Sequence, residues 1–287
     1  MDRSAEGVVS GLQRLTSVAE ALVRPRYEVI PLDGTEEAVL EHVPTEVTVT
    51  VTTSPAKGLE PTLALSERLA GHGYDVVPHL AARHVRDGAH LAELVARLVP
   101  TGSIDVLVMA GDAKEPAGDF DGSAPLLRAL AELGNPFREV GITGYPESHG
   151  FIADAATIKS MFEKEEFATY IVSQICFEPQ TTAAWMRAVW ERGTRLPIHI
   201  GLPGPIAGAK LLRVCERIRV GASIDSLRTD ERAQNGDFDP DPLVRELDEV
   251  LGEAPANFGG FHVFTFNDLA HTEEWRQRRL AAGAGVP

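Results

Sequence analysis

An acidic residue interrupts an apolar stretch near the start of the chain. Glu28 lies between Tyr27 and Val29 in the segment YEVIPL, whose composition predicts a β-strand. A carboxyl group inside an apolar strand loses solvation, so we expect its pKa to rise and the group to donate a proton near neutral pH. The alternative is an ordinary ion pair with a neighbouring arginine, Arg24 or Arg26.

Three more polar residues lie at or near the ends of predicted strands. Asp112 directly follows IDVLVMAG, His79 lies near the end of YDVVPHLA, and Gln174 lies within TYIVSQICF. Asp112 has a structural alternative as the cap of the next helix, and His79 as a satisfied histidine of the core. Gln174 is harder to explain in this way, because a buried amide needs several hydrogen-bond partners. The coincidence of these residues at strand ends counts for more than any one of them.

The chain alternates between apolar runs and helical patterns. Runs rich in Val and Ile predict eight strands, at 27–32, 46–52, 74–81, 104–111, 139–146, 169–177, 196–204 and 261–266. Helical patterns lie between them, and the seventh connection has two helices. This alternation predicts an α/β fold, a closed (β/α)8 TIM barrel wrapped in helices. An open doubly wound sheet is the alternative, but no GxGxxG turn follows the first strand.

We predict a single domain with an extra N-terminal helix. It consists of a helical extension over 1–25, the barrel over 26–270 and a C-terminal tail over 271–287. In such a barrel the active site lies at the carboxyl ends of the strands, where side chains share one mouth. Besides the four residues above, we expect five more residues from the predicted strand ends at this mouth: Thr52, Tyr145, Glu147, His149 and Asn267.

Composition argues against several classes of function. A formal net charge of −15 opposes binding to nucleic acids or anionic membranes, which needs clustered Lys and Arg. The sequence shows no apolar run of about 18 residues and no secretory signal, so we expect a cytoplasmic protein without a membrane partner. Cys176 and Cys215 are expected to be buried thiols. Without HxH or HExxH spacing, no metal site is predicted.

The segments at the predicted strand ends resemble the motifs of one known family. The resemblance runs in the same order over residues 27 to about 268. It pairs RYEVIPL with FEFFPP, VTVTTSP with VTYGA, PHLAAR with PHLTC, VLVMAGDAKEP with LRGDPP, GYPESH with YPExH, IVSQICFE with TQxFFD, and GFHVFTFND with FHFYTLNR. So many matching motifs in one order are specific, and the family that they resemble is the methylenetetrahydrofolate reductases.

The resemblance implies reduction of 5,10-methylenetetrahydrofolate to 5-methyltetrahydrofolate, a step toward methionine, with NADH or NADPH as the hydride donor. Glu28 would protonate N10 and open the imidazolidine ring, Asp112 would hold the pterin and stabilise the 5-iminium cation, and Gln174 would orient folate or nicotinamide. Gly111 would let the bound ring approach closely. The resemblance further implies a substrate contact at Asn267 and cofactor contacts at Thr52, His79, Met109, Ala110, Gly111, Tyr145 and His149.

Several flavin contacts of the family are replaced in this chain. Ala110 stands where the family has an arginine, and the loop 121–127 has no tyrosine and no aspartate at the family's position. Near the position of a family lysine stand Glu163, Glu165 and Glu166, which we expect to repel a diphosphate. We therefore predict that FAD binds weakly or not at all, and that the nicotinamide passes its hydride directly to the folate.

Two alternatives remain open. One is a folate-binding or regulatory barrel without catalysis, and the other is an FAD-dependent reductase of a related substrate. Asp268 replaces the arginine that follows the final asparagine in the family, so part of the folate contact differs. The sequence does not distinguish NADH from NADPH, and it predicts no oligomeric state.

Overall fold

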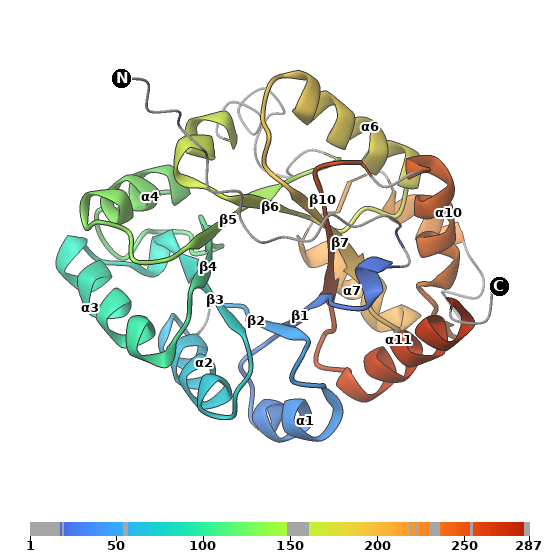
Figure 1. The fold of residues 1–287 in the computed structure, drawn as a ribbon, viewed down its shortest axis with the longest axis horizontal. Helices are drawn as coiled ribbons and strands as arrows, with labels where there is room; N and C mark the ends of the chain where they lie inside the picture. Colours follow the sequence, from blue (N-terminus) through green and yellow to red (C-terminus); the bar gives the residue numbers. More distant parts are fainter. Residues whose placement is uncertain are drawn as a thin grey trace, which may run out of the picture.

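Eight parallel strands close into one barrel in the computed structural model (Figure 1). The order around the barrel is β1-β10-β7-β6-β5-β4-β3-β2, and each neighbouring pair is parallel. The strands are β1 (Arg26–Val29), β2 (Thr48–Val51), β3 (Val76–Ala81), β4 (Asp105–Met109), β5 (Glu139–Gly144), β6 (Tyr170–Ser173), β7 (Ile198–Pro203) and β10 (Phe258–Phe264). The predicted (β/α)8 TIM barrel is therefore confirmed. The structure describes residues 18, 20–53, 57–147, 161–218, 220–221, 223–229, 236–252 and 255–283.

A ring of helices surrounds the strands (Figure 1). The α-helices are α1 (Thr35–His42), α2 (Glu60–Gly71), α3 (Gly88–Leu98), α4 (Ser123–Glu132), α6 (Pro179–Glu191), α7 (Gly208–Ile218), α8 (Ile224–Thr229), α10 (Asp241–Leu251) and α11 (Leu269–Gly283). Most coincide with the helical patterns of the sequence, because each buries an apolar face on the barrel. The connection from β7 to β10 also holds a short antiparallel pair that the patterns do not predict, β8 (Ile206–Ala207) with β9 (Asp237–Phe238). No described helix has the length and apolar character needed to cross a membrane.

The two ends of the described chain pack together beside β1. Of the helical extension predicted over 1–25, the structure describes Val18 and the residues from Glu20 onward, and Glu20–Leu22 forms a 3-10 helix. The remainder of that prediction lies outside the described residues. At the other end, α11 occupies most of the segment predicted as a tail. Its Arg276 donates to the backbone oxygen of Leu22 at 3.2 Å, which ties α11 to the N-terminal segment.

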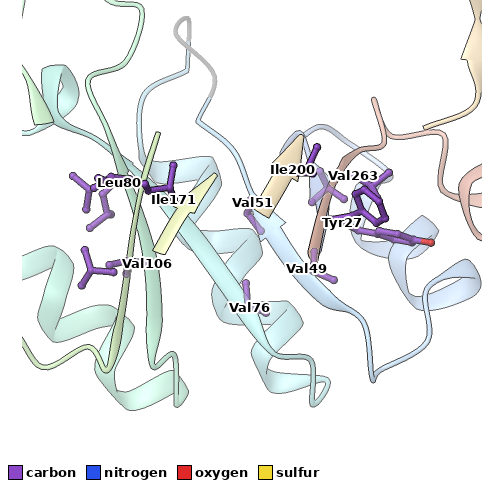
Figure 2. Close-up of a cluster of buried hydrophobic side chains, with 14 of the residues drawn as sticks. Tyr27, Val49, Val51, Val76, Leu80, Val106, Ile171, Ile200 and Val263 are labelled. Carbon is purple, nitrogen blue, oxygen red and sulfur yellow. The ribbon is translucent and has the colours of Figure 1, made fainter. Parts of the chain in front are cut away.

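The outer face of the barrel carries the main hydrophobic core. Alternate side chains of each strand point outward, because a β-strand directs successive residues to opposite faces. Figure 2 shows part of this core, with labels on Tyr27, Val49, Val51, Val76, Leu80, Val106, Ile171, Ile200 and Val263. These branched and aromatic side chains fill the space between strands and helices. Cys176 and Cys215 are buried and unpaired, as expected.

Glycines inside the barrel leave room for large rings. A Cβ on Gly141 of β5 would lie 2.4 Å from the ring of Tyr170, and a Cβ on Gly259 would lie 3.0 Å from the imidazole of His199. Tyr170 and His199 themselves meet edge to face, with ring centroids 5.3 Å apart. Polar rings therefore take space inside this barrel that branched aliphatic side chains commonly fill in the fold.

We expect Gly141→Ala to destabilise the protein. The added methyl group would lie 2.4 to 2.6 Å from three atoms of the buried Tyr170 ring, and overpacking a core costs about 1–3 kcal/mol. Gly71→Ala is the matched control, because nothing lies within 4 Å of a Cβ at that end of α2. Urea unfolding followed by circular dichroism compares the two variants. A parent-like midpoint for Gly141→Ala would contradict this description of the interior.

Candidate active site

Three side chains from three strands meet inside the barrel. Glu28 comes from β1, His79 from β3 and His262 from β10. Glu28 Oε2 lies 3.1 Å from His262 Nε2 and 4.0 Å from His79 Nδ1. The two imidazole rings stack with their centroids 6.1 Å apart. The Glu28 side chain is 16% exposed, whereas the side chains of His79 and His262 are 0% and 1% exposed.

Strand alternation explains why Glu28 and His262 point into the barrel. Their neighbours in sequence, among them Tyr27 and Val263, pack in the outer core (Figure 2). Since side chains alternate along a strand, Glu28 and His262 face the interior. β1 and β10 are adjacent strands, which brings the two side chains within hydrogen-bond distance.

A buried ion pair occupies the preceding interior position of β1. Arg26 Nη1 donates to Asp105 Oδ2 at 2.9 Å, and the Tyr170 hydroxyl donates to Asp105 Oδ1 at 2.8 Å. The guanidinium carbon of Arg26 also lies 4.2 Å from the centroid of the Tyr170 ring, a cation–π contact. Burial disfavours the guanidinium charge, but Tyr170 and Asp105 outweigh it and raise the pKa of Arg26. The alternative that Arg26 pairs with Glu28 is therefore wrong.

Burial sets the protonation of the three groups that meet inside the barrel. It raises the pKa of Glu28, and His79 partly offsets that effect. Burial lowers the pKa of His79 to about 4 and that of His262 to about 3, and the positive charge of Arg26 contributes to both shifts. Both imidazoles are therefore uncharged near neutral pH. Of the three groups, Glu28 is the one whose proton affinity is increased.

His79 does not behave as a satisfied core histidine. Neither of its ring nitrogens has a hydrogen-bond partner among the described residues, and Nδ1 of His262 also lacks one. The structural alternative for His79 is therefore wrong. Most buried polar atoms have a partner, so these nitrogens mark a place where a water, an ion or a ligand would bind.

Gly111 and Asp112 lie in the loop after β4. Gly111 has a φ of +84°, and a Cβ there would lie 2.9 Å from Ala81 Cβ, because the loop packs directly on the end of β3. Asp112 is exposed, and the N-cap of α4 is Gly122, so Asp112 does not cap that helix. Burial raises the pKa of Tyr145, and Asp112 adds to the shift. The Tyr145 hydroxyl donates to Thr143 Oγ1 at 3.3 Å, next to the end of β5.

Gln174 and Thr52 also follow strands at this end of the barrel. Gln174 is half-buried after β6, and its Oε1 accepts a hydrogen bond from the backbone nitrogen of Ile175 at 2.9 Å. Thr52 is half-buried after β2. Glu28, Asp112 and Gln174 thus belong to the same, carboxyl end of the barrel. In the described part of the chain, no hydrogen bond joins Gln174 to either acid.

The remaining predicted residues have different surroundings. Met109 is half-buried at the end of β4, and Ala110 is exposed beside it. The amide of Asn267 is already engaged, since its Oδ1 accepts from the nitrogen of Ile30 and its Nδ2 donates to the oxygen of Ile30, both at 2.8 Å. Asn267 therefore holds the turn after β10 against the end of β1. His149 lies outside the described residues.

Glu147 fastens the rim of the barrel. Its carboxylate accepts hydrogen bonds from the backbone nitrogen of Ser223 at 2.6 Å and from Ser223 Oγ at 2.5 Å. Ser223 Oγ in turn accepts from the backbone nitrogen of Phe177 at 2.9 Å. These bonds connect the segments after β5 and β6 to the start of α8.

Three glutamates precede β6. Glu163, Glu165 and Glu166 lie just before the amino end of this strand, and the following Thr169 bonds to Val140 near the start of β5. That these glutamates repel a diphosphate stays a prediction.

Three interior residues were not selected from the sequence. His262 offered a signal, because it sits between two apolar residues as Glu28 does. Arg26 offered a weaker one, two positions before Glu28 on the same face of the strand. Asp105 offered none, since its pairing with Arg26 depends on how β1 and β4 face each other inside the closed barrel.

Comparison with known proteins gives a family match and two structural likenesses. A family model described as methylenetetrahydrofolate reductase matches residues 36–235, a range that includes Asp112 and Gln174 but not Glu28 or His262. A structure described as a lyase/mutase from Burkholderia cenocepacia J2315 has 16% identity and a TM-score of 0.51, covering 93% of this chain and 85% of that chain. A 2,3-dimethylmalate lyase has 10% identity and a TM-score of 0.49, covering 95% and 90%. The likeness to the first structure shows the fold alone.

We expect Gly111→Ala to displace the loop that carries Asp112. Alanine at a positive φ costs about 1–2 kcal/mol in any case, and here its methyl group would also press on the buried Ala81. Gly102→Ala is the matched control, with a similar φ of +81° and nothing within 4 Å. Urea unfolding should show a larger loss of stability for Gly111→Ala. Equal losses would mean that the loop accommodates a methyl group.

Proposed function

Because the chain belongs to the methylenetetrahydrofolate reductase family, we propose that it reduces 5,10-methylenetetrahydrofolate to 5-methyltetrahydrofolate with a hydride from NADH or NADPH. Family membership supports an oxidoreductase that acts on a folate. The observation that carries the proposal is Glu28, a carboxyl group whose pKa burial raises, beside the uncharged His79 and His262. A reaction that begins by protonating a nitrogen needs such an acid.

In the proposed reaction, Glu28 donates its proton to N10 of the substrate. The bond between N10 and the methylene carbon breaks, its electron pair goes to N10, and the methylene group stays on N5 as an iminium cation. The reduced nicotinamide transfers a hydride to the methylene carbon, which becomes the methyl group. The products are 5-methyltetrahydrofolate and the oxidised nucleotide, and Glu28 regains a proton from solvent.

The interior charges favour a protonated Glu28. Arg26 lies two positions away on the same face of the strand, but its charge is balanced by Asp105 at 2.9 Å. His79 and His262 supply no positive charge near neutral pH, because burial lowers the pKa of each. The carboxyl group therefore keeps its proton until the substrate nitrogen accepts it. The 3.1 Å contact with His262 Nε2 orients the group.

Two rim residues are proposed to act on the folate itself. Asp112 would hold the pterin and place negative charge near the iminium cation, where electrostatic stabilisation is most effective. Gln174 would orient folate or nicotinamide through its amide nitrogen, since its Oε1 accepts from the backbone of Ile175. Tyr145 follows β5 at the same end of the barrel and would also contact the substrate or the nucleotide.

The described residues at the mouth do not fit the family's way of holding FAD. Ala110 is exposed where the family has an arginine, and a methyl group cannot pair with a diphosphate. The loop 121–127 has no tyrosine. We therefore propose direct hydride transfer from the nicotinamide to the folate, with both bound at once. Thr52 and His149 would contact the nucleotide, and the buried His79 would support the site from beneath.

We expect Glu28→Gln to lower kcat by roughly 10²–10⁴-fold, the usual contribution of a general acid. The amide has nearly the same shape but has no acidic proton to give, so the fold and folate binding should persist. Glu41→Gln is the control, because Glu41 is 74% exposed on α1. NAD(P)H oxidation with 5,10-methylenetetrahydrofolate measures all three proteins. Equal rates for Glu28→Gln and the parent would refute the assigned role, and inactivity of the parent would favour a folate-binding barrel without catalysis.

Direct transfer also predicts the kinetic pattern. Both substrates must be bound before hydride moves, so double-reciprocal plots at several folate concentrations should intersect. The purified protein should show no flavin absorbance, and added FAD should leave the rate unchanged. Parallel lines, or flavin released on denaturation, would indicate a flavin shuttle and overturn the direct route.

A further inference from the structure

His79 presents an unexplained feature of the interior. Its side chain is 0% exposed, and neither ring nitrogen has a hydrogen-bond partner among the described residues. Leaving a buried polar atom without a partner costs about 1–3 kcal/mol. A ligand that accepts a nitrogen lone pair would remove part of that cost, and a metal ion is one such ligand.

The three groups inside the barrel have the spacing of a metal site. One ligand atom from each of Glu28, His79 and His262 lies within 4.8 Å of the other two. Zinc binds nitrogen and oxygen ligands at about 2.0–2.2 Å, so neighbouring ligand atoms of one ion lie roughly 3–3.6 Å apart. Glu28 Oε2 is 3.1 Å from His262 Nε2 and 4.0 Å from His79 Nδ1. The first distance lies within this range, and the second is less than 1 Å longer than its upper end.

We propose that Glu28, His79 and His262 bind one divalent transition-metal ion, of the class of Zn²⁺ or Co²⁺. Two imidazoles and one carboxylate are a donor set that such ions prefer, whereas Mg²⁺ and Ca²⁺ prefer all-oxygen sites. The ligands come from β1, β3 and β10, so the barrel wall fixes their positions. Three protein ligands leave a coordination position for water or substrate.

The surrounding charges allow a cation at this position. Arg26 would repel an ion, but Asp105 lies 2.9 Å from its guanidinium and balances that charge. Glu28 releases its proton to solvent when the ion binds, and its carboxylate then supplies one negative charge directly to the ion. Imidazole binds metals in its uncharged form, and the side chains of His79 and His262 are both buried.

The ion should exchange rather than stay permanently bound. Histidines that hold a metal usually donate their second ring nitrogen to a carboxylate or carbonyl, and losing one such partner weakens binding about 10–100-fold. In the described part of the chain, His79 and the Nδ1 atom of His262 have no partner of this kind. The site therefore fits a metal ion that binds reversibly and acts as an inhibitor, rather than a permanently bound structural metal.

The consequence for catalysis depends on the proposed function. An ion on Glu28 Oε2 takes the lone pair that would otherwise carry the proton for N10. Metal binding and proton donation then exclude each other, so Zn²⁺ should inhibit the reductase and a chelator should restore it. Binding itself needs neither folate nor nicotinamide, which keeps the metal site testable on its own.

The test is a titration of chelator-treated, full-length protein with Co²⁺, whose visible absorption reports coordination by protein ligands. We expect one Co²⁺ bound reversibly per chain, displaced by Zn²⁺, and binding at least 10-fold weaker in His79→Gln and His262→Gln. His271→Gln is the matched control, because His271 is 70% exposed and pairs with Asp268 on the surface. Thermal unfolding confirms that each variant is folded. If a histidine variant does not fold, Glu28→Gln removes the charged ligand with little change in shape.

Three results would overturn the metal site. They are no Co²⁺ spectrum in the parent, unchanged affinity in the folded interior variants, and loss of binding in His271→Gln. Metal binding in a protein without reductase activity would refute the proposed function and leave the metal site intact. Reductase activity in a protein that binds no Co²⁺ and is not inhibited by Zn²⁺ would refute the metal site and leave the proposed function intact.

Discussion

The surroundings of Glu28 are the physical constraint on which the site depends. A carboxyl group beside a free guanidinium would ionise readily, and Arg26 lies on the same face of the same strand. Asp105 and Tyr170 prevent this, because they hold Arg26 through an ion pair and a cation–π contact. Glu28 is left among imidazoles that burial keeps uncharged. The pKa of Glu28 thus depends on Arg26, Asp105 and Tyr170, which lie deeper in the barrel.

A polar interior of this kind needs stability from elsewhere. The outward-facing Val, Ile and Leu side chains pack under the helices and form the main core (Figure 2). Inside, Gly141 and Gly259 make room for Tyr170 and His199. This division lets the barrel place charged and aromatic groups at its centre while the outer layer supplies most of the apolar burial.

The sequence predicts the barrel well because strands and helices are local patterns. Runs of Val and Ile bounded by turn residues located all eight strands. The alternation of side chains along a strand places Glu28 inward. Contacts across the barrel do not follow from local patterns, because the partners are distant in sequence. Arg26 and Asp105 are 79 positions apart. Sequence reasoning therefore found the acid but not the groups that set its protonation.

One geometry underlies both chemical roles proposed for the interior cluster. Uncharged imidazoles beside a carboxyl group favour a proton on that group. The nitrogen lone pairs of these imidazoles also favour binding of a divalent ion. The ion gains two nitrogen ligands, whereas the proton needs only the carboxyl oxygen and one contact at 3.1 Å to His262. Ring nitrogens without hydrogen-bond partners weaken metal binding, but they do not affect binding of a proton by Glu28. A site built this way remains an acid by default and is open to a metal when one is present.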